Sequence, residues 1–231
     1  MPQRLNLSET VFFVFLLCIA LFVFFRSAFF NIEKIEVVGT SRLSAARVRE
    51  IAGITCGRSI FKVKTAEVEA RLRRLTLVKD VRVVRKMPRT IVIHIEERRP
   101  LVLLFRDGAF WEVDGDGVLL ARASLEASDL PLVTGTRPGD ASWPAAARVA
   151  RSLNSLSGVR FAEIHSTPDA RITAYTTDGI EVRLGTAAER DLREQVAILG
   201  EVLKTARERG GRIVYIDLSE PGRPVVKYGE G

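Results

Sequence analysis

The sequence predicts an α+β protein with an N-terminal transmembrane helix, a βααββ domain and a mixed β domain that contains two helices. Three observations lead to this prediction. Residues 11–25 form an uninterrupted apolar run, VFFVFLLCIALFVFF. Residues 31–100 alternate apolar and charged residues with period 2, and two short segments among them have helical spacing. Residues 101–231 contain many short alternating segments, Asp-Gly turn signals and two longer helical patterns.

The apolar run has the composition of a membrane anchor. A helix that crosses about 30 Å of hydrocarbon needs about 20 residues, so we expect a transmembrane helix over residues 11–30 after a cytoplasmic tail of residues 1–10. The alternative is a cleaved signal peptide, but its basic region would consist of Arg4 alone and no A-x-A-like cleavage site follows. The few flanking Lys and Arg residues do not decide the orientation. A single anchor ahead of the folded part of the chain is typical of a tethered extracytoplasmic protein.

Residues 31–100 are expected to form two helices packed on a small sheet. Ser44 and Thr65 each precede a helical pattern and are predicted to be N-caps. Residues 86–89 form a connection compatible with a hairpin. The predicted elements are a strand at 32–39, helices at 45–52 and 66–75, and strands at 81–85 and 90–97. The predicted core consists of Ile35, Val37, Val48, Ile51, Val68, Leu72, Val81, Val83, Ile91, Ile93 and Ile95.

Residues 101–231 are expected to be rich in strands, with Asp-Gly pairs at hairpin turns because these residues accept the positive φ angles that tight turns require. The DGDG sequence at 114–117 could suggest a calcium loop, but Val118 and Leu125 stand where further oxygen ligands would be needed, so we interpret it as a turn. Gly210 and Gly211 are expected to end the last helix. The predicted strands lie at 101–105, 109–113, 118–121, 159–165, 171–176, 180–184, 213–218 and 225–228, and the predicted helices at 144–157 and 187–209.

Composition argues against several kinds of binding site. The formal net charge of +7 suits proximity to an anionic surface. The basic residues of 62–99 alternate with apolar residues and are not interleaved with aromatic residues, so we interpret them as a solvated strand face rather than a nucleic-acid site. Two cysteines, Cys18 and Cys56, and two separated histidines, His94 and His165, favour neither an intramolecular disulfide nor a metal site.

The motifs of the common enzyme classes are missing from the sequence. It contains no G-x-S-x-G, H-E-x-x-H, phosphate-loop or dinucleotide-binding signature. We therefore expect no catalytic residues, no cofactor and no small-molecule substrate. A cell-wall hydrolase is the enzymatic alternative that an assay with peptidoglycan would exclude.

Residues 75–100, LTLVKDVRVVRKMPRTIVIHIEERRP, resemble the end of a POTRA domain of the bacterial FtsQ/DivIB cell-division family. The residues that match the pattern of this family are Val78, Val81, Val83, Arg85, Pro88, Ile91, Ile93, Ile95, Glu97 and Pro100. Three later segments, WEVDGDGVLL, LPLVTG and RIVYIDLSEPGRPVVKY, resemble motifs of the β domain of the same family. Ser219 stands where members of the family commonly carry Arg, so the resemblance does not extend to an ionic contact at this position.

The resemblance implies a non-catalytic divisome scaffold. Such a protein is a single-pass type II protein of the cytoplasmic (inner) membrane, with a POTRA domain at 31–100 and a β domain at 101–231 on the periplasmic side, concentrated at the division septum. It would bind small coiled-coil division proteins of the FtsB and FtsL type and help control septal peptidoglycan synthesis. The alternative is a POTRA-containing chaperone of outer-membrane assembly or secretion, for which an N-terminal helix is the wrong type of anchor.

The C-terminal strand is the candidate site for a partner. A short strand entered through a proline is expected at a sheet edge, because proline cannot donate a ladder hydrogen bond. An exposed edge can pair with a strand of another protein, or it can remain solvated. The resemblance implies that this strand binds FtsB. The candidate partner-binding residues are Pro224, Val225, Val226, Lys227 and Tyr228.

Overall fold

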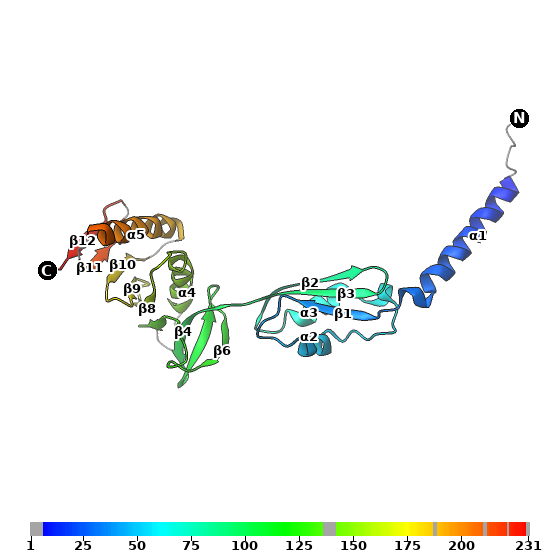
Figure 1. Ribbon diagram of the computed structural model, residues 1–231, viewed down its shortest axis with the longest axis horizontal. Coiled ribbons are helices and arrows are strands. Elements are labelled where there is room, and N and C mark those ends of the chain that lie inside the picture. Colours follow the sequence, from blue (N-terminus) through cyan, green and yellow to red (C-terminus); the bar gives the residue numbers. More distant parts are fainter. Residues whose placement is uncertain (1–6, 136–141, 187–188, 210–211, 221, 230–231) are drawn as a thin grey trace, which may run out of the picture. The chain divides into compact units, whose positions relative to one another are not determined.

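The computed structural model of the protein describes residues 7–135, 142–186, 189–209, 212–220 and 222–229 (Figure 1). The chain divides into two compact units, Met1–Glu97 and Arg98–Gly231. The helix end predicted at Gly210 and Gly211 and most of the predicted tail lie outside the described residues.

The first helix, α1, covers Leu7–Arg26, and a short 3₁₀ turn, η1, follows at Ala28–Phe30. The large apolar side chains of α1 from Val11 to Phe25 are exposed on all sides of the helix. Among the helices in the described ranges, none meets the combined length and hydropathy that a membrane-spanning segment requires.

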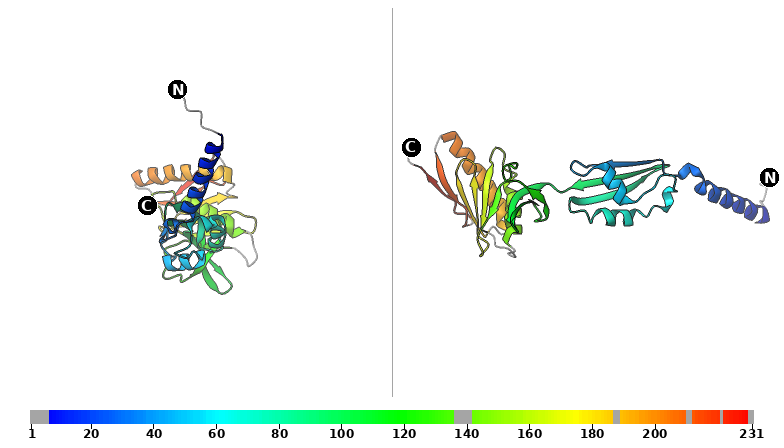
Figure 2. Two further views of the ribbon diagram at one scale, coloured as in Figure 1. Left: turned by 90° about the vertical axis from the view of Figure 1, so that its right-hand side faces the viewer. Right: turned by 90° about the horizontal axis from the view of Figure 1, so that it is seen from below.

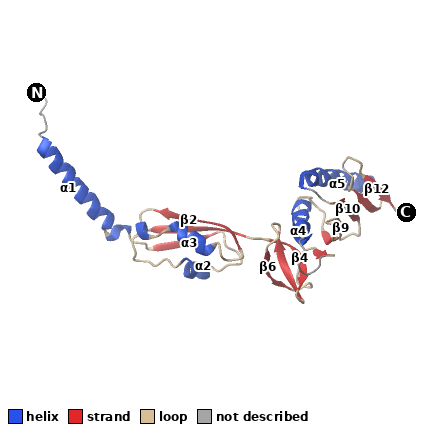
Figure 3. Ribbon diagram, turned by 180° about the vertical axis from the view of Figure 1, so that it is seen from behind, coloured by secondary structure: helices blue, strands red, loops and turns tan. Residues whose placement is uncertain are grey.

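The rest of the first unit is a three-stranded sheet with two helices packed on one face (Figures 1 and 3). Its elements are β1 (Lys34–Val38), α2 (Ala45–Ala52), η2 (Ile60–Lys62), α3 (Thr65–Leu72), β2 (Val78–Lys86) and β3 (Thr90–Glu97). The strand order is β1-β3-β2, with β1 parallel and β2 antiparallel to β3. The α+β class and the βααββ order of this unit are confirmed.

The core of this unit contains the predicted residues, together with the buried residues Phe30, Ile32, Ala52, Ile60, Val63 and Val78, which were not predicted. Eight of the eleven predicted residues are buried, and the remaining three, Ile35, Val37 and Ile51, are partly buried and packed against them. Gly39 ends β1 with φ +87°, and a Cβ at this position would collide with the carbonyl oxygen of Ile95. A glycine is therefore required where the chain leaves the sheet.

The two helices of this unit differ in how well their ends were predicted. Ser44 caps α2 as predicted, because its Oγ accepts a hydrogen bond from the Arg47 N–H at 3.2 Å. The predicted cap at Thr65 is wrong: Thr65 is the first residue of α3, and Lys64 precedes it without a side-chain cap. The helix also ends at Leu72 rather than at residue 75, since the next residues form tighter bonds between residues three apart.

The Glu97 carboxylate holds the loop that follows β1. It accepts hydrogen bonds of 2.9–3.0 Å from the backbone N–H groups of Ser41, Arg42 and Leu43 and from the Ser41 hydroxyl. Partial burial acts to raise the pKa of Glu97, but these hydrogen bonds outweigh it and hold the pKa below its usual value.

We expect Glu97→Gln to lower the free energy of unfolding of the first unit by about 1–3 kcal/mol at neutral pH, because charged hydrogen bonds are lost. A depressed pKa stabilises the folded state above the unfolded-state pKa, and this contribution is lost as the pH falls through the folded-state pKa. The difference in the free energy of unfolding between the parent and Glu97→Gln should therefore become smaller below about pH 4.5. Hydrogen exchange of the β3 amides across a pH series measures this difference. The matched control is Glu96→Gln, which removes only an exposed ion pair with Lys79 and should cost about 0–1 kcal/mol.

The second unit is a nine-stranded mixed sheet with two helices over one face (Figure 2). Its strands are β4 (Pro100–Arg106), β5 (Ala109–Asp114), β6 (Leu119–Ala123), β7 (Leu132–Thr134), β8 (Phe161–Ser166), β9 (Ile172–Thr176), β10 (Glu181–Gly185), β11 (Ile213–Asp217) and β12 (Val225–Tyr228). Its helices are α4 (Ser142–Leu153) and α5 (Glu189–Arg209). The strand order is β12-β11-β10-β9-β8-β7-β4-β5-β6, so β12 and β6 are the two edges.

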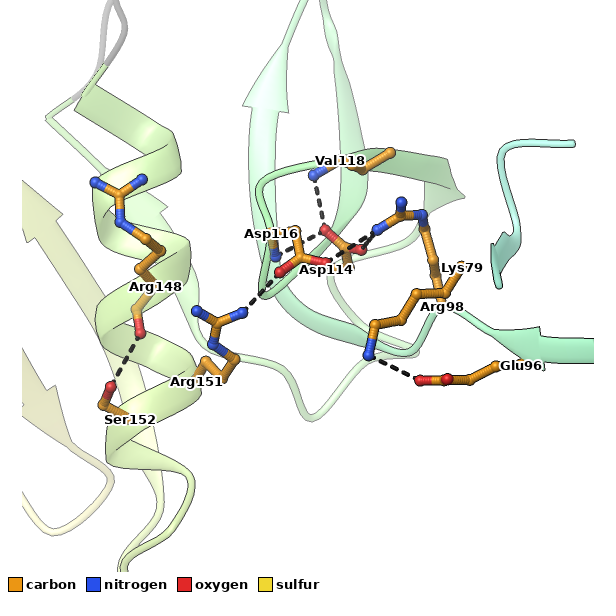
Figure 4. A network of polar contacts seen from close by, with 9 residues as sticks. All are labelled: Lys79, Glu96, Arg98, Asp114, Asp116, Val118, Arg148, Arg151 and Ser152. Carbon is orange, nitrogen blue, oxygen red and sulfur yellow. Dashed lines mark hydrogen bonds and ion pairs between the residues drawn. The ribbon is translucent and has the colours of Figure 1, made fainter. Parts of the chain in front are cut away.

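The DGDG sequence forms the turn between β5 and β6, as predicted (Figure 4). Asp114 is 3% exposed, and one carboxylate oxygen accepts from the N–H groups of Asp116 and Val118 at 3.0 and 2.7 Å. The other oxygen accepts from Arg98 at 2.5 Å. Asp116 forms an ion pair of 2.7 Å with Arg151 on α4. The acidic residues therefore fasten the turn to the start of the unit and to α4.

Candidate functional site: the C-terminal sheet edge

The last strand, β12, lies at the edge of the large sheet, as the position of Pro224 predicted. It pairs antiparallel with β11 and has no second neighbouring strand among the residues that the structure describes. The register places Val225, Val226 and Lys227 opposite Asp217, Ile216 and Tyr215, and Tyr228 opposite Ile213. The candidate residues predicted from the sequence thus form one continuous segment along the open edge.

The backbone of β12 offers hydrogen-bonding groups on its open side at alternate residues. The Gly229 N–H donates to the Arg212 carbonyl oxygen at 2.8 Å, so the backbone at this residue is directed toward β11. Because backbone N–H and C=O groups alternate in direction along a strand, residues 225 and 227 are also directed toward β11. Val226 and Tyr228 are then directed toward the open edge.

The side chains of the edge are mixed in character. Val225 and Tyr228 are 53% and 45% exposed, whereas Val226 is partly buried against the core under the helices. The Lys227 ammonium lies 6.0 Å from the centre of the Tyr215 ring. A strand added beside β12 would therefore meet exposed apolar and aromatic area as well as backbone groups.

A polar and aromatic surface adjoins the edge on the sheet face that carries Lys227. The register aligns Glu163, Tyr175, Glu181, Tyr215 and Lys227 in one row across five strands. Burial and the nearby carboxylates of Glu181 and Glu163 raise the pKa of the Tyr175 phenol, which keeps it protonated and able to donate.

Arg183 is the cationic centre of this surface. Its guanidinium lies 4.6 Å from the centre of the Tyr215 ring and forms an ion pair of 2.7 Å with Glu181. It also lies 3.9 Å from the Asp217 carboxylate. Ser219 turns back on the same carboxylate, because its N–H and hydroxyl both donate to Asp217 Oδ1, at 2.9 and 2.5 Å. A guanidinium close to this carboxylate therefore comes from β10, whereas Ser219 makes a local turn.

Sequence analysis did not find Arg183, Tyr215 and Asp217 as one group. The alternation of residues 213–218 places Tyr215 and Asp217 on one face, which is the available signal. The contact with Arg183 depends on the parallel pairing of β10 with β11 across the intervening α5, and no local pattern reports that pairing.

A buried glutamine fixes the platform from which β12 extends. The Gln195 side-chain amide, on α5, donates to the carbonyl oxygens of Leu184 and Leu218 at 3.1 and 2.8 Å. These carbonyls lie at the ends of β10 and β11, so the helix holds both strand ends where the chain turns toward β12. The edge strand is consequently part of a sheet whose two neighbouring strand ends are hydrogen-bonded to α5.

The groups gathered at this edge are backbone groups, aromatic side chains and charged side chains. Within the described ranges, no group of three or more His, Cys, Asp or Glu side chains is arranged to hold a metal ion. The edge instead combines open backbone groups, exposed aromatic area and fixed charges, which suit the addition of an extended segment of another protein.

Two protein-family models match the chain. The first, "POTRA domain, FtsQ-type", matches residues 30–98, and the second, "Cell division protein FtsQ/DivIB, C-terminal", matches residues 102–219.

Cell division proteins of several bacteria have similar sequences. The chain is 31% identical over 186 residues to cell division protein DivIB of Geobacillus kaustophilus, a match that covers 78% of this chain and 70% of the relative. It is 30% identical over 231 residues to cell division protein FtsQ of Streptomyces venezuelae, with 97% and 84% of the two chains covered.

Among solved structures, the chain is similar to the major extracytoplasmic domain of DivIB from Geobacillus stearothermophilus. The match has 19% sequence identity and a TM-score of 0.35, and it covers 49% of this chain and 97% of the DivIB chain.

Proposed function

Because the chain belongs to the FtsQ/DivIB family of bacterial cell-division proteins, we propose that it is a non-catalytic scaffold of the division machinery. Its partners in this proposal are small coiled-coil division proteins of the FtsB and FtsL type, and through them it helps control septal peptidoglycan synthesis. The POTRA domain occupies residues 31–100 and the partner-binding β domain residues 101–231. The observation that carries the proposal is the open edge of β12.

The proposed mode of binding is strand addition. A partner segment pairs with the outward backbone groups of Val226 and Tyr228 and extends the sheet by one strand. Its side chains contact the exposed Val225 and Tyr228 side chains. Aromatic area adds affinity, while the backbone bonds fix direction and register.

Two measurements in cells test this function. A fluorescent fusion of the full chain should concentrate at midcell during division. Affinity purification of the tagged chain from detergent-solubilised membranes should recover the FtsB-like and FtsL-like proteins of the same cell. Diffuse peripheral fluorescence together with absence of both partners would contradict the proposal.

We further propose that α1 anchors the protein in the cytoplasmic membrane, with both domains on the extracytoplasmic side. The support is the length of the helix, 20 residues, which at about 1.5 Å per residue approaches the thickness of the hydrocarbon core. The exposed apolar side chains around its whole circumference also support it, because a surface of this kind is stable only in contact with lipid or protein.

We expect the full chain to remain in the membrane fraction after alkaline carbonate extraction, with residues 62–231 cleaved by protease added to intact spheroplasts. A variant with Phe13→Lys, Leu17→Lys and Leu21→Lys should lose this retention, because each lysine near the centre of a bilayer costs about 2.5–3.5 kcal/mol. A peripheral membrane protein in the same preparation is the extraction control. Release of the parent chain by carbonate would contradict anchoring, and protease protection in spheroplasts would invert the orientation.

A further inference from the structure

Three exposed large apolar side chains lie at the end of the POTRA domain next to α1. Outside α1, the exposed large apolar residues described in the first unit are Phe29, Val38, Phe61, Val84 and Met87. Phe29, Phe61 and Met87 belong to three separate segments, namely η1, η2 and the β2–β3 turn. The contacts described next bring these segments to the same end of the domain.

Aromatic contacts join α1 to this end of the domain. The Phe25 ring lies 5.6 Å from Phe61, and the Phe30 ring lies 5.2 Å from Phe61 and 5.1 Å from Phe29 (centroid distances). Phe24 in turn lies 6.1 Å from Phe29. These ring contacts therefore connect the apolar side chains at the end of α1 with η1 and η2.

Arg89 brings the β2–β3 turn to the same place. Its guanidinium lies 5.4 Å from the centre of the Phe29 ring, and its Nε donates to the Phe29 carbonyl oxygen at 2.9 Å. It also forms an ion pair with Glu33. Met87, two residues earlier, is 47% exposed in this turn.

Basic side chains surround these apolar residues. Arg58 is exposed and its carbonyl oxygen accepts from the Ile32 N–H at 2.9 Å, which places it beside the segment that leaves η1. Lys62 on η2 and Lys86, the last residue of β2, are also exposed. We call the surface formed by Phe29, Arg58, Phe61, Lys62, Lys86 and Met87 the junction surface.

We propose that the junction surface seats the POTRA domain on the anionic phospholipid headgroups of the membrane that α1 enters. This inference rests on the proposed anchoring by α1. Aromatic side chains are favoured at the headgroup level, and basic residues within a Debye length of an anionic leaflet are attracted to it. Glu33, next to the surface, is paired with Arg89, and Glu36, which interacts with Lys86, is paired with Lys34, so the net charge offered to the lipid is positive.

The consequence is a fixed orientation of the POTRA domain relative to the bilayer. Two groups of contacts hold the domain. The first is its packing against α1, and the second is the contact of the aromatic and basic side chains of the junction surface with the lipid headgroups. A domain held only by a flexible tether would sample many orientations, whereas this seat would present the same side of its sheet to other proteins of the cell envelope.

Cys56 provides a probe beside this surface. It is exposed and lies two residues before Arg58, and the second cysteine of the chain, Cys18, is in α1. The full chain with Cys18→Ala would be labelled with a fluorophore at Cys56 and reconstituted into vesicles of phosphatidylcholine with or without phosphatidylglycerol. A nitroxide quencher attached to the lipid headgroup reports the proximity of the label to the bilayer surface.

We expect quenching in the vesicles that contain phosphatidylglycerol, and a loss of quenching with phosphatidylcholine alone or at high salt. Phe61→Ser and Lys62→Glu should each reduce the quenching. The matched controls are Val38→Ser and Arg82→Glu. Both residues are exposed and both pair with His94, at the end of β3 away from the β2–β3 turn, so these changes should leave the quenching unchanged.

Flotation of the same vesicles separates the two proposals. A chain that does not float with vesicles overturns the anchoring itself. A chain that floats without quenching at Cys56, as expected if the junction surface binds another protein instead, overturns the lipid seat alone. The lipid seat is also overturned if the quenching is equal in both kinds of vesicle and is unchanged by Phe61→Ser and Lys62→Glu. Such quenching would report only that Cys56 is close to the membrane anchor.

Discussion

Replacement of Ile93 by alanine is expected to lower the free energy of unfolding of the POTRA domain by about 2–5 kcal/mol. Ile93 is fully buried at the middle of β3, the central strand of the sheet. It lies between Val37 on β1 and Val83 on β2, on the face covered by the two helices. Close packing on every side leaves little room for the surrounding side chains to fill the cavity.

The control for this variant is Val84→Ala. Val84 lies on β2 and is 41% exposed, so its truncation should change the free energy of unfolding by less than about 0.5 kcal/mol. Because the protein has two units, a single unfolding curve would mix their transitions. Hydrogen exchange of the β3 amides reports the first unit alone. Equal protection in Ile93→Ala and in the parent would mean that the faces of β3 are assigned backwards.

The core of the first unit could be predicted from the sequence because its signals are local. The alternation in residues 90–97 identifies the buried face of β3, and the Ser44 hydroxyl marks the start of α2. The end of α3 could not be predicted in the same way. Leu75 continues the apolar spacing of the helix, but it packs beside the core from a turn that has already left the helix.

The second unit shows where local signals fail. The hairpin at Asp107 and Gly108 was predicted, and both residues have the positive φ angles, 52° and 74°, that a tight turn requires. The three-residue strand β7, Leu132–Thr134, was missed because it is too short to alternate. It pairs parallel with both β4 and β8. Its strand conformation therefore depends on pairing with these neighbouring strands rather than on a pattern in its own sequence.

One part of the candidate site could be predicted from a local signal, and another part could not. A proline before a short terminal strand is a local signal for a sheet edge, and the bounds and edge position of β12 agree with it. The surface around Arg183 depends on strand order, which is a property of the whole sheet. The direction of each backbone group along β12 depends on the bulged register with β11, and the sequence carries no signal for it.

Replacement of Val226 by proline is expected to abolish co-purification of the FtsB-like partner. The Val226 N–H is directed away from β11, so its loss leaves the pairing of β12 with β11 intact while it removes a donor from the open edge. The carbonyl oxygen of an added strand would then lose its partner in the interface, which costs about 1–3 kcal/mol, or about 5- to 150-fold in affinity. The proline ring also occupies space on the side from which the added strand approaches.

The matched control is Val226→Ala, which keeps the N–H and removes side-chain volume from the partly buried position. It should retain the partner, while Tyr228→Ala should bind more weakly through the loss of exposed aromatic area. Hydrogen exchange of β11 amides checks that the sheet stays folded in each variant. If Val226→Pro retains the partner as well as Val226→Ala does, with β11 protected in both, then strand addition at β12 is wrong. The contact would then have to come from side chains elsewhere on the domain, and the row from Glu163 to Lys227 with Arg183 would be the next surface to mutate.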